Sequence, residues 1–262
     1  MKTRLDAELV RRGLAKSRES ALELIDEKLV LVSGIPASKA ATQVDAQTSI
    51  TLKEIKEQYV SRGGFKLEGA IQAFPQIQIK EKVVLDAGAS TGGFTDVLLK
   101  NGAKKVFAVD VGYGQLAWEL QNDPRVKIFD RVNIRNLNLE QLGEEVDLVV
   151  ADLSFISLRL VIPSLISVSK SDADYLLMVK PQFEVGKDKL GSGGVVREIA
   201  LRKSAVLEVA QVAYDLGIGC LGVIASSLPG PAGNVEYFLW LKANAPAILE
   251  VDLDRAISEG PQ

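Results

Sequence analysis

The sequence predicts an α/β protein in which helices cover both faces of a mostly parallel sheet, preceded by a small α+β domain. From Val83 onward, short apolar runs typical of strands alternate with helix-like segments, which is the pattern of strand–helix–strand units. Before residue 53 the pattern differs, because two short amphipathic helices precede a hairpin. The length of 262 residues suits one domain of ordinary size and one small domain. We therefore expect a first domain at residues 1–52, a linker at 53–61 and a second domain at 62–262.

The elements of the first domain follow from apolar spacing and from residues that end helices. A first helix with an apolar stripe ends at Gly13, and Ser17 is a suitable N-cap for a second helix. Leu29-Val30-Leu31-Val32 predicts a strand, Ser33-Gly34 a turn and Ile50-Thr51-Leu52 a closing strand.

The second domain is expected to begin with a helix that runs through Ala73, followed by strands and helices in alternation. The expected strands are Val83–Asp86, Lys105–Val109, Lys127–Asp130, Val146–Ala151, Tyr175–Val179, Gly222–Ala225 and Val235–Leu241. The last two are joined by a loop that contains Pro229-Gly230-Pro231, and we expect them to pair antiparallel at an edge of the sheet.

Composition and charge narrow the classes of function. Hydrophobic residues make up 47% and charged residues 25% of the chain, which predicts a packed core rather than disorder. The net charge of −3 by itself indicates no nucleic-acid or membrane partner, but the charge is unevenly distributed. Residues 1–66 carry 12 Lys and Arg against 9 Asp and Glu, and the first eighteen residues are the most basic part. A polyanion-binding surface is expected there, with a solvated helix face as the alternative.

Three features restrict location and chemistry. The single cysteine, Cys220, allows no internal disulfide, and the charged N-terminus lacks the apolar core of a signal peptide, so we expect a cytoplasmic location. The longest uncharged run, residues 216–235, contains five glycines and two prolines, which predicts strand and loop rather than a membrane span. The chain has no histidine, so the usual general base and His-containing metal sites are absent, and we expect no metal.

The stretch from Val84 to Asp110 predicts a ligand site, because it reads as strand, glycine-rich turn, helix, strand and terminal aspartate. In a doubly wound sheet the ligand lies beyond the carboxyl ends of the strands, and a glycine such as Gly88 lets the backbone approach it closely. Asp110 can accept hydrogen bonds from ribose hydroxyls, so an adenosine-bearing cofactor is expected. Ser90 stands where a dinucleotide fingerprint needs glycine, and Asp86 would oppose a pyrophosphate but suits the amino-acid end of S-adenosylmethionine. A dinucleotide and a purely structural turn are the alternatives.

Four charged side chains are expected to converge beside this turn. Asp152 and Lys180 each follow an apolar strand, Glu236 lies early in the last strand, and Lys66 lies in SRGGFKL before the sheet. Each has an ordinary alternative as a helix cap, a surface charge or an edge-strand charge. Charges flanked by apolar strands cost free energy unless they are paired, and two lysines with two carboxylates would satisfy one another.

Such a cluster suits methyl transfer to a ribose 2′-hydroxyl, an in-line displacement that needs alignment and a base but no metal. A buried lysine beside a second cation can act as the base, and we assign this role to Lys180. Asp152 would orient Lys180 and lie near the departing methyl group. Lys66 and Glu236 would position the hydroxyl and adjust Lys180, while proximity would supply much of the rate.

Motifs along nearly the whole chain resemble one known family. The order Lys66, Asp152, Lys180, Glu236 is similar to the K-D-K-E tetrad of FtsJ-like ribose 2′-O-methyltransferases. The stretches VSRGGFKL, LDAGASTGGFTDVLL, DVGYGQLAW, DLVVADLSFISL, VKPQFEVGK and LPGPAGNVEYFLWL resemble the TlyA family. RLDAELVRRGLAKSRESALELI resembles the start of the S-four-type RNA-binding domain of that family.

The resemblance implies a Rossmann-like class I S-adenosylmethionine-dependent methyltransferase domain after a small RNA-binding domain. It implies methylation of a cytidine 2′-hydroxyl in ribosomal RNA, with the large ribosomal subunit as the main expected substrate and the small subunit as a further one. It also implies a link to capreomycin and viomycin susceptibility. It also implies a monomer without a membrane partner. The cofactor residues carried over are Gly88, Ser90, Thr91, Gly92, Phe94 and Thr95 in the turn, Asp110 and Val111 at the ribose, Asn133 near the adenine, and Asp152.

The basic N-terminal side chains are expected to contact RNA phosphates, with recognition resting on RNA shape and an unstacked target nucleotide. These residues are Arg4, Arg11, Arg12, Lys16 and Arg18. The hairpin departs from the family pattern, because Lys28 and Ser33 replace the usual glycine and asparagine, and a positive φ is mildly strained there.

Three other functions are alternatives. A non-catalytic RNA-binding assembly factor would not need both lysines of the tetrad. A membrane-active protein is suggested by the haemolysin label of some TlyA relatives, but the sequence has no spanning segment and no long basic amphipathic helix with an aromatic face. A dinucleotide oxidoreductase is opposed by Ser90.

Overall fold

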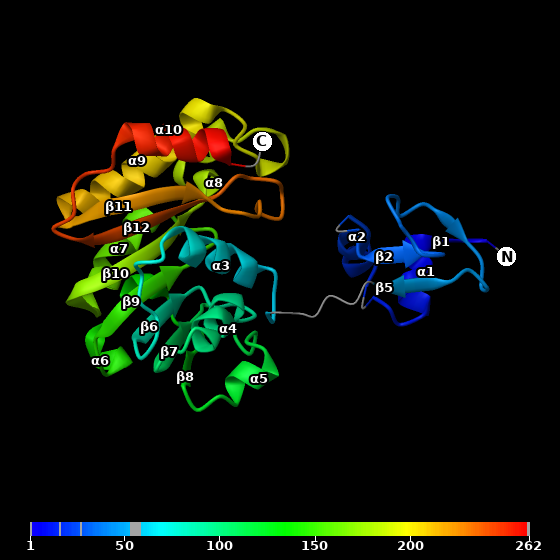
Figure 1. The fold of residues 1–262 in the computed structure, drawn as a ribbon, viewed down its shortest axis with the longest axis horizontal. Coiled ribbons are helices and arrows are strands. Elements are labelled where there is room, and N and C mark those ends of the chain that lie inside the picture. Colours follow the sequence, from blue (N-terminus) through cyan, green and yellow to red (C-terminus); the bar gives the residue numbers. More distant parts are fainter. Residues whose placement is uncertain (1, 16, 27, 53–58, 261–262) are drawn as a thin grey trace. The chain divides into compact units, whose positions relative to one another are not determined.

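The computed structural model describes residues 2–260 apart from 16, 27 and 53–58. The chain forms two compact units, Met1–Gln58 and Tyr59–Gln262 (Figure 1). Most of the predicted linker lies outside the described residues, so the linker stays a prediction.

The N-terminal unit is a small α+β fold, as predicted. Its helices and strands are β1 (Thr3–Arg4), α1 (Leu5–Arg11), α2 (Arg18–Asp26), β2 (Val30–Val32), β3 (Ile35–Pro36), β4 (Gln43–Val44) and β5 (Ile50–Leu52). Strand β2 lies between β3 and β5, and β1 pairs with β4. The core forms where the apolar faces of both helices meet this sheet, around Leu5, Leu9 and Ile25. Lys28 and Ser33 do adopt positive φ, 56° and 50°, so the hairpin forms despite the strain that the sequence predicts.

The second unit contains a seven-stranded sheet in the order β11-β12-β10-β9-β6-β7-β8. Its strands are β6 (Val83–Ala87), β7 (Lys105–Val109), β8 (Val126–Phe129), β9 (Val146–Ala151), β10 (Ser169–Val179), β11 (Ile218–Ala225) and β12 (Tyr237–Ala243). Strand β12 runs antiparallel to both of its neighbours, and the pairs among β10, β9, β6, β7 and β8 are parallel. The predicted antiparallel pairing of the last two strands is therefore confirmed.

Two strand boundaries differ from the prediction, and the second of them matters for the site. Strand β10 begins six residues earlier than expected, because Ser169 pairs with Val146 ahead of a register shift that ends at Asp174. Strand β12 begins at Tyr237, so Glu236 lies in the preceding loop and not inside the strand.

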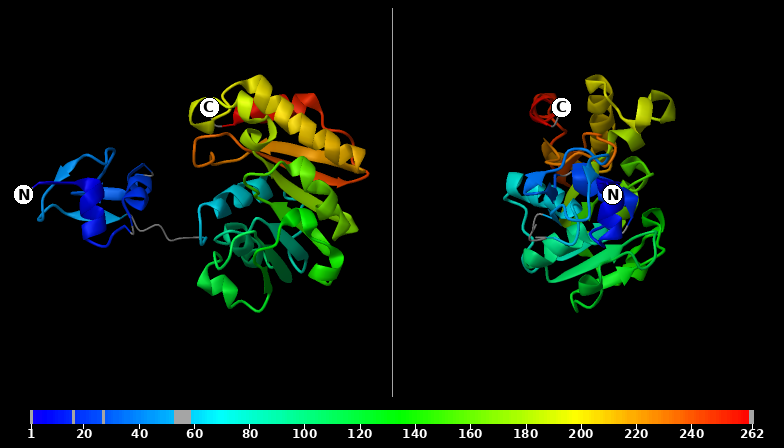
Figure 2. Two further views of the ribbon diagram at one scale, coloured as in Figure 1. Left: turned by 180° about the vertical axis from the view of Figure 1, so that it is seen from behind. Right: turned by 90° about the vertical axis from the view of Figure 1, so that its right-hand side faces the viewer.

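Helices cover both faces of the sheet, as the alternation of strands and helices predicts. They are α3 (Gly63–Ala73), α4 (Gly93–Lys100), α5 (Trp118–Gln121), α6 (Leu139–Leu142), α7 (Ile162–Ser167), α8 (Pro181–Glu184), α9 (Ile199–Asp215) and α10 (Glu250–Glu259). Helices α3, α4 and α5 pack on one apolar face, and α6, α7, α9 and α10 on the other. Alternate strand residues serve the two cores: Leu176 and Met178 belong to the first and Leu177 and Val179 to the second. Figure 2 shows α9 and α10 side by side along β11.

Residues 59–61 belong to the second unit and not to the predicted linker. Tyr59 is buried, its ring meets Phe65 edge-on at 5.3 Å, and its hydroxyl donates to Glu68 at 3.0 Å. The backbone N–H of Val60 donates to Asp96 in the first turn of α4. The segment before α3 is thus fastened to α4, which begins at the glycine turn.

In the described part of the chain, no helix combines the length and the apolar character that crossing a membrane requires.

Candidate active site

The carboxyl ends of the parallel strands bring the predicted site residues to one edge of the sheet. The glycine turn follows β6, Asp110 follows β7, Asp152 follows β9 and Lys180 follows β10. Because β9, β6 and β7 are neighbours, three of these segments lie side by side. This edge is where doubly wound folds bind ligands.

The glycine turn is held close to the end of β9. Gly88 has φ 89°, and a Cβ atom there would lie 2.5 Å from the backbone oxygen of Asp152. Gly92, at the N-cap of α4, has φ 99°, so both positions require glycine. Ser90 is left-handed as well, with φ 47°. Between these two glycines, the side chains of Ser90 and Thr91 are exposed.

Asp110 is positioned by this turn and by its own loop. Its carboxylate accepts the N–H of Ser90 at 2.8 Å and the N–H of Gly112 at 2.7 Å. It still lines a cavity of about 500 Å³, together with Val111, Asn133, Phe155 and Ile156. An acceptor fixed at the rim of a largely apolar cavity is what a ribose next to an adenine ring requires.

Asp86 does not line this cavity or the one that holds the lysines. Its side chain is fully buried, and one carboxylate oxygen accepts the hydroxyl of Thr95 at 2.6 Å while the other has no hydrogen-bond partner. The predicted direct contact of Asp86 and Thr95 with a cofactor therefore stays a prediction. Burial raises the pKa of Asp86 to about 7, against the hydrogen bond from Thr95.

The Asp86 pKa leads to a prediction about stability. The folded protein binds a proton on the Asp86 carboxyl more tightly than the unfolded chain does. The protonated Asp86 therefore adds to the free energy of unfolding, by a total of about 4 kcal/mol. This stabilisation is complete below about pH 4 and is lost as the pH rises to about 7. We expect Asp86→Asn to remove this part of the pH dependence, measured by urea unfolding from pH 4 to 8. The exposed Asp215, changed to Asn, is the control. An unaltered profile in Asp86→Asn would assign the pH dependence to other groups.

The four charged residues form two lysine–carboxylate pairs. Lys180 Nζ lies 2.5 Å from Asp152 Oδ1 and 3.0 Å from the hydroxyl oxygen of Ser154. Lys66 Nζ lies 2.5 Å from Glu236 Oε2, and both side chains are at least nine-tenths buried. Each lysine is buried against apolar strands, where an unpaired charge would be costly.

Three of the four residues share one cavity of about 270 Å³. Lys66, Asp152 and Lys180 line it, together with Ser90 and Thr91 of the turn. Glu236 does not line it and reaches Lys66 from the loop before β12. This cavity shares Gly88, Ser90, Asp152 and Ser154 with the larger one, so the two adjoin. A ligand in the larger cavity would thus present one end to the lysines, which fits an adenosine joined to a short amino-acid chain.

Glu236 is held from three sides. Besides Lys66, the amide of Gln182 approaches its second oxygen at 3.5 Å, and a Cβ at Gly230 would lie 2.6 Å from that oxygen. Gly230 therefore packs its backbone against the carboxylate. No sequence pattern indicates this contact, because Gly230 between two prolines is typical of an ordinary turn.

We expect Gly230→Ala to lower kcat about tenfold, because the new methyl group moves the Glu236 carboxylate away from Lys66. Gly233→Ala is the control from the same loop: its φ of 88° makes alanine strained, but no atom lies within 4 Å. That variant should lose stability and keep its kcat. Equal kcat values for the two variants would contradict the role of Gly230.

A second group of site residues was missed by sequence reasoning. Buried Glu184 accepts the hydroxyl of Ser157 and the N–H of Leu158, and pairs with Arg159. It thereby fastens the loop after Asp152 to α8, which begins just after Lys180. Burial raises the pKa of Glu184, against these hydrogen bonds. Glu184 lies in VKPQFEVGK, one of the stretches that resemble the TlyA family, but no pattern in that stretch indicates these contacts.

Phe155 in the same loop is 92% exposed with φ 64°, and it packs on Phe183 with ring centroids 5.2 Å apart. A left-handed, solvent-exposed phenylalanine at the rim of a cavity is energetically unfavourable by itself. Its position suits contact with a flat ligand.

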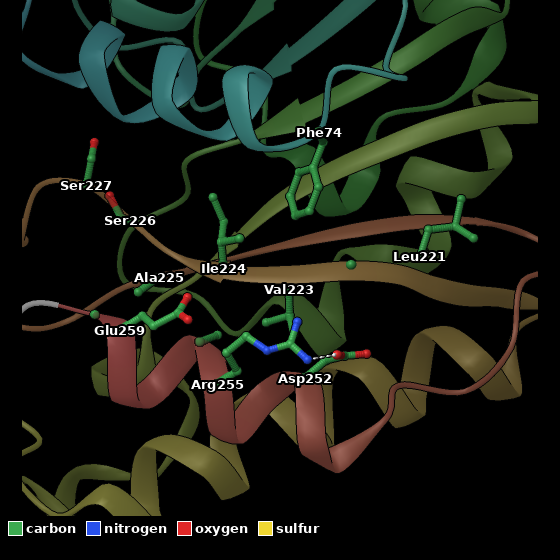
Figure 3. A pocket seen from close by; sticks show the side chains of 13 residues that line it. Phe74, Leu221, Val223, Ile224, Ala225, Ser226, Ser227, Asp252, Arg255 and Glu259 are labelled. Carbon is green, nitrogen blue, oxygen red and sulfur yellow. Dashed lines mark ion pairs between the residues drawn. The ribbon is translucent and has the colours of Figure 1, made fainter.

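A cavity of about 760 Å³ lies elsewhere, along the edge strand β11 (Figure 3). Phe74 lies on one side of the strand, and Asp252 and Arg255 of α10 lie on the other. None of the predicted site residues lines it, and Arg255 is paired with Asp252. We assign it no chemistry.

The predicted RNA-contacting residues belong to the N-terminal unit. Lys16 is one of them but lies outside the described residues. The side chains of Arg4, Arg11 and Arg18 are 48%, 62% and 63% exposed. Arg12 differs, because its guanidinium is turned inward and donates to the backbone oxygens of Thr48, Asp45 and Ala46. The structure thus gives Arg12 a place in the fold of the unit that the charge pattern did not predict.

Comparison with known proteins agrees with this arrangement. Residues 59–243 match the FtsJ-like methyltransferase family, and residues 3–50 match the S4 domain. The chain is 55% identical to the 16S/23S rRNA (cytidine-2'-O)-methyltransferase TlyA of Mycobacterium tuberculosis, with 99% of both chains covered. It is 36% identical to Hemolysin A of Brachyspira hyodysenteriae, over 89% of this chain and 97% of that one. A solved structure from Streptococcus thermophilus, named "Putative hemolysin", has 35% identity and a TM-score of 0.79, over 98% of this chain and 95% of that one. The chain therefore belongs to the FtsJ-like methyltransferases, and among them to the TlyA family with its N-terminal S4 domain.

Proposed function

We propose that this protein transfers a methyl group from S-adenosylmethionine to the 2′-hydroxyl of a cytidine in ribosomal RNA. The observation that supports this best is that two lysine–carboxylate pairs lie at the glycine turn of a methyltransferase fold. The name of the M. tuberculosis relative supplies the nucleotide and the RNA.

The cofactor would occupy the two adjoining cavities. Asp110 would accept hydrogen bonds from the ribose hydroxyls, Val111 and Asn133 would border the adenine, and the turn from Gly88 to Thr91 would border the amino-acid end. Gly92, Phe94 and Thr95 would support the turn from below. When bound, S-adenosylmethionine supplies an electrophilic methyl group on a sulfonium.

The protein's own part is to position a hydroxyl and to remove its proton. Lys180 accepts the proton of the 2′-hydroxyl at Nζ, and Asp152 holds that nitrogen in place. Lys66, held by Glu236, donates a hydrogen bond to the oxygen that loses the proton. The exposed Phe155 gives the base of the target nucleotide a face to contact.

RNA binding falls to the N-terminal unit in this proposal. Arg4, Arg11 and Arg18 contact phosphates, which gives affinity that falls with salt. The partner is RNA within ribosomal subunits, the enzyme is a monomer, and its place is the cytoplasm, where that RNA resides. The competing function is an RNA-binding assembly factor without catalysis, which would bind the same RNA but would not need Lys180.

Nucleoside analysis tests the proposal. Large and small ribosomal subunits that lack the modification are incubated with the protein and S-adenosylmethionine, and the RNA is digested to nucleosides. We expect 2′-O-methylcytidine to appear. Tight binding of subunits with no methylated nucleoside would favour the assembly factor.

A further inference from the structure

Two acidic residues lie in the middle of the basic surface that is proposed to bind RNA. Asp6 and Glu8 are on α1, and only 4% and 2% of these residues is exposed. Acidic side chains next to an RNA-binding surface should weaken binding, because they repel phosphates. Their burial and their contacts point to a different role.

Asp6 holds two arginines. Arg4 donates to it through Nε and Nη2, both at 3.0 Å, which is the two-bond fork of guanidinium and carboxylate. Arg18, at the start of α2, reaches the same carboxylate with Nη2 at 3.4 Å. Asp6 also accepts the backbone N–H of Ala7, so the carboxylate itself cannot rotate freely. The hydrogen bond from Arg4 lowers the pKa of Asp6, so it is ionised at neutral pH.

Glu8 repeats the arrangement two residues further along α1. Arg11 donates to it through Nε and Nη2, both at 2.7 Å. Arg12 adds a bond from Nε at 2.7 Å but turns its other nitrogens to backbone oxygens. The hydrogen bonds from Arg11 and Arg12 lower the pKa of Glu8 to about 2.

The fork leaves binding capacity on the exposed arginines. A guanidinium has five N–H donors. Arg4 and Arg11 each use two of them in a fork, and Arg18 uses one. Arg4, Arg11 and Arg18 are 48% to 63% exposed, so the remaining donors face solvent. An unpaired arginine on the surface samples many rotamers and loses that freedom when it binds a phosphate, whereas a held arginine has already lost it.

We propose that Asp6 and Glu8 are positioning residues of a phosphate-binding surface made by Arg4, Arg11 and Arg18, an inference that rests on the proposed RNA methyltransferase function. The two carboxylates fix the directions of the guanidiniums, and the RNA phosphates take the remaining donors. The loss of two negative charges would then weaken RNA binding, which is the opposite of what net charge predicts.

The direction in which RNA affinity changes when a negative charge is removed distinguishes a positioning role from simple charge repulsion. Binding of the full chain to purified large ribosomal subunits is measured at several salt concentrations for Asp6→Asn, Asp6→Glu and Asp26→Asn. Asp26, at the end of α2, is exposed and matches Asp6 in charge change. We expect Asp26→Asn to bind as tightly as the wild type or more tightly. Asp6→Asn and Asp6→Glu should bind at least fivefold more weakly, and Asp6→Asn should lose about 0.7–0.9 from the salt slope, the value of one phosphate contact.

Kinetics separate positioning from folding. In methyl transfer, the Asp6 variants should raise KM for the subunits more than they lower kcat, with thermal unfolding of the protein monitored in parallel. If Asp6→Asn does not fold, Glu8→Gln is judged by the same criterion through Arg11. The inference is overturned if a folded Asp6→Asn binds as tightly as Asp26→Asn. A wild-type protein that neither binds nor methylates the subunits would instead remove the proposed function, and the inference with it.

Discussion

Replacing Lys180 with alanine is expected to slow methyl transfer by about 10²–10⁴-fold, the range that a positioned general base contributes. The Lys180 Nζ lies at the cavity beside the glycine turn, where it pairs with Asp152 and donates to the hydroxyl of Ser154. The affinity for S-adenosylmethionine should change little, because Lys180 lines the smaller cavity and does not line the larger one, which holds Asp110 and Asn133. Single-turnover transfer of labelled methyl measures the first effect and calorimetry the second.

The control for Lys180 is Lys170→Ala. Lys170 is an ion-paired lysine at the opposite end of β10, 2.7 Å from Asp147 and half exposed. The Lys170→Ala protein should transfer methyl at the wild-type rate. A Lys180→Ala protein within a few fold of this control would mean that the proton leaves by another route, and the assignment of the base would be wrong.

Removing Glu236 alone is expected to lower the free energy of unfolding by about 3–5 kcal/mol and to abolish activity, because Lys66 is left buried without its partner. Replacing both residues with apolar side chains of similar size, Lys66→Met with Glu236→Leu, removes the unpaired charge as well. The double variant should regain much of the stability and stay inactive. Urea unfolding and methyl transfer on the same preparations separate the two effects.

The surface pair Lys203 and Asp254 is the control for this experiment. Its members lie 2.8 Å apart but are 25% and 59% exposed, so Asp254→Ala should cost no more than about 1 kcal/mol. A double variant of Lys66 and Glu236 that recovers its activity would show that the pair serves the fold and not the reaction.

Much of the site could be predicted because parallel strands end at one edge. Strand ends can be located from apolar runs, so Asp110, Asp152 and Lys180 could be placed together before their distances were known. The glycine turn was recognisable for a different reason. Gly88 and Gly92 stand where only glycine readily adopts the backbone angles that the turn needs.

The rest depended on contacts between residues far apart in the chain. Lys66 and Glu236 are separated by 170 positions, and Glu184 reaches the loop 26 positions earlier. No local pattern indicates that Gly230 touches a carboxylate or that Arg12 turns inward. A carboxyl in the middle of an apolar strand, such as that of Asp86, gives no sign of which side of the sheet it faces. The start of β12 was set too early because Val235 and Tyr237 are equally apolar.

The most direct test of the central claim is to map the methyl group itself. Ribosomal subunits lacking the modification are incubated with labelled S-adenosylmethionine and either the wild-type protein or Lys180→Ala, and the RNA is then hydrolysed with alkali. We predict label in one alkali-resistant dinucleotide that begins with cytidine, present with the wild type and absent with Lys180→Ala. Label in a base or at a phosphodiester that alkali still cleaves, or equal label with both proteins, would contradict a lysine-assisted ribose 2′-O-methyl transfer.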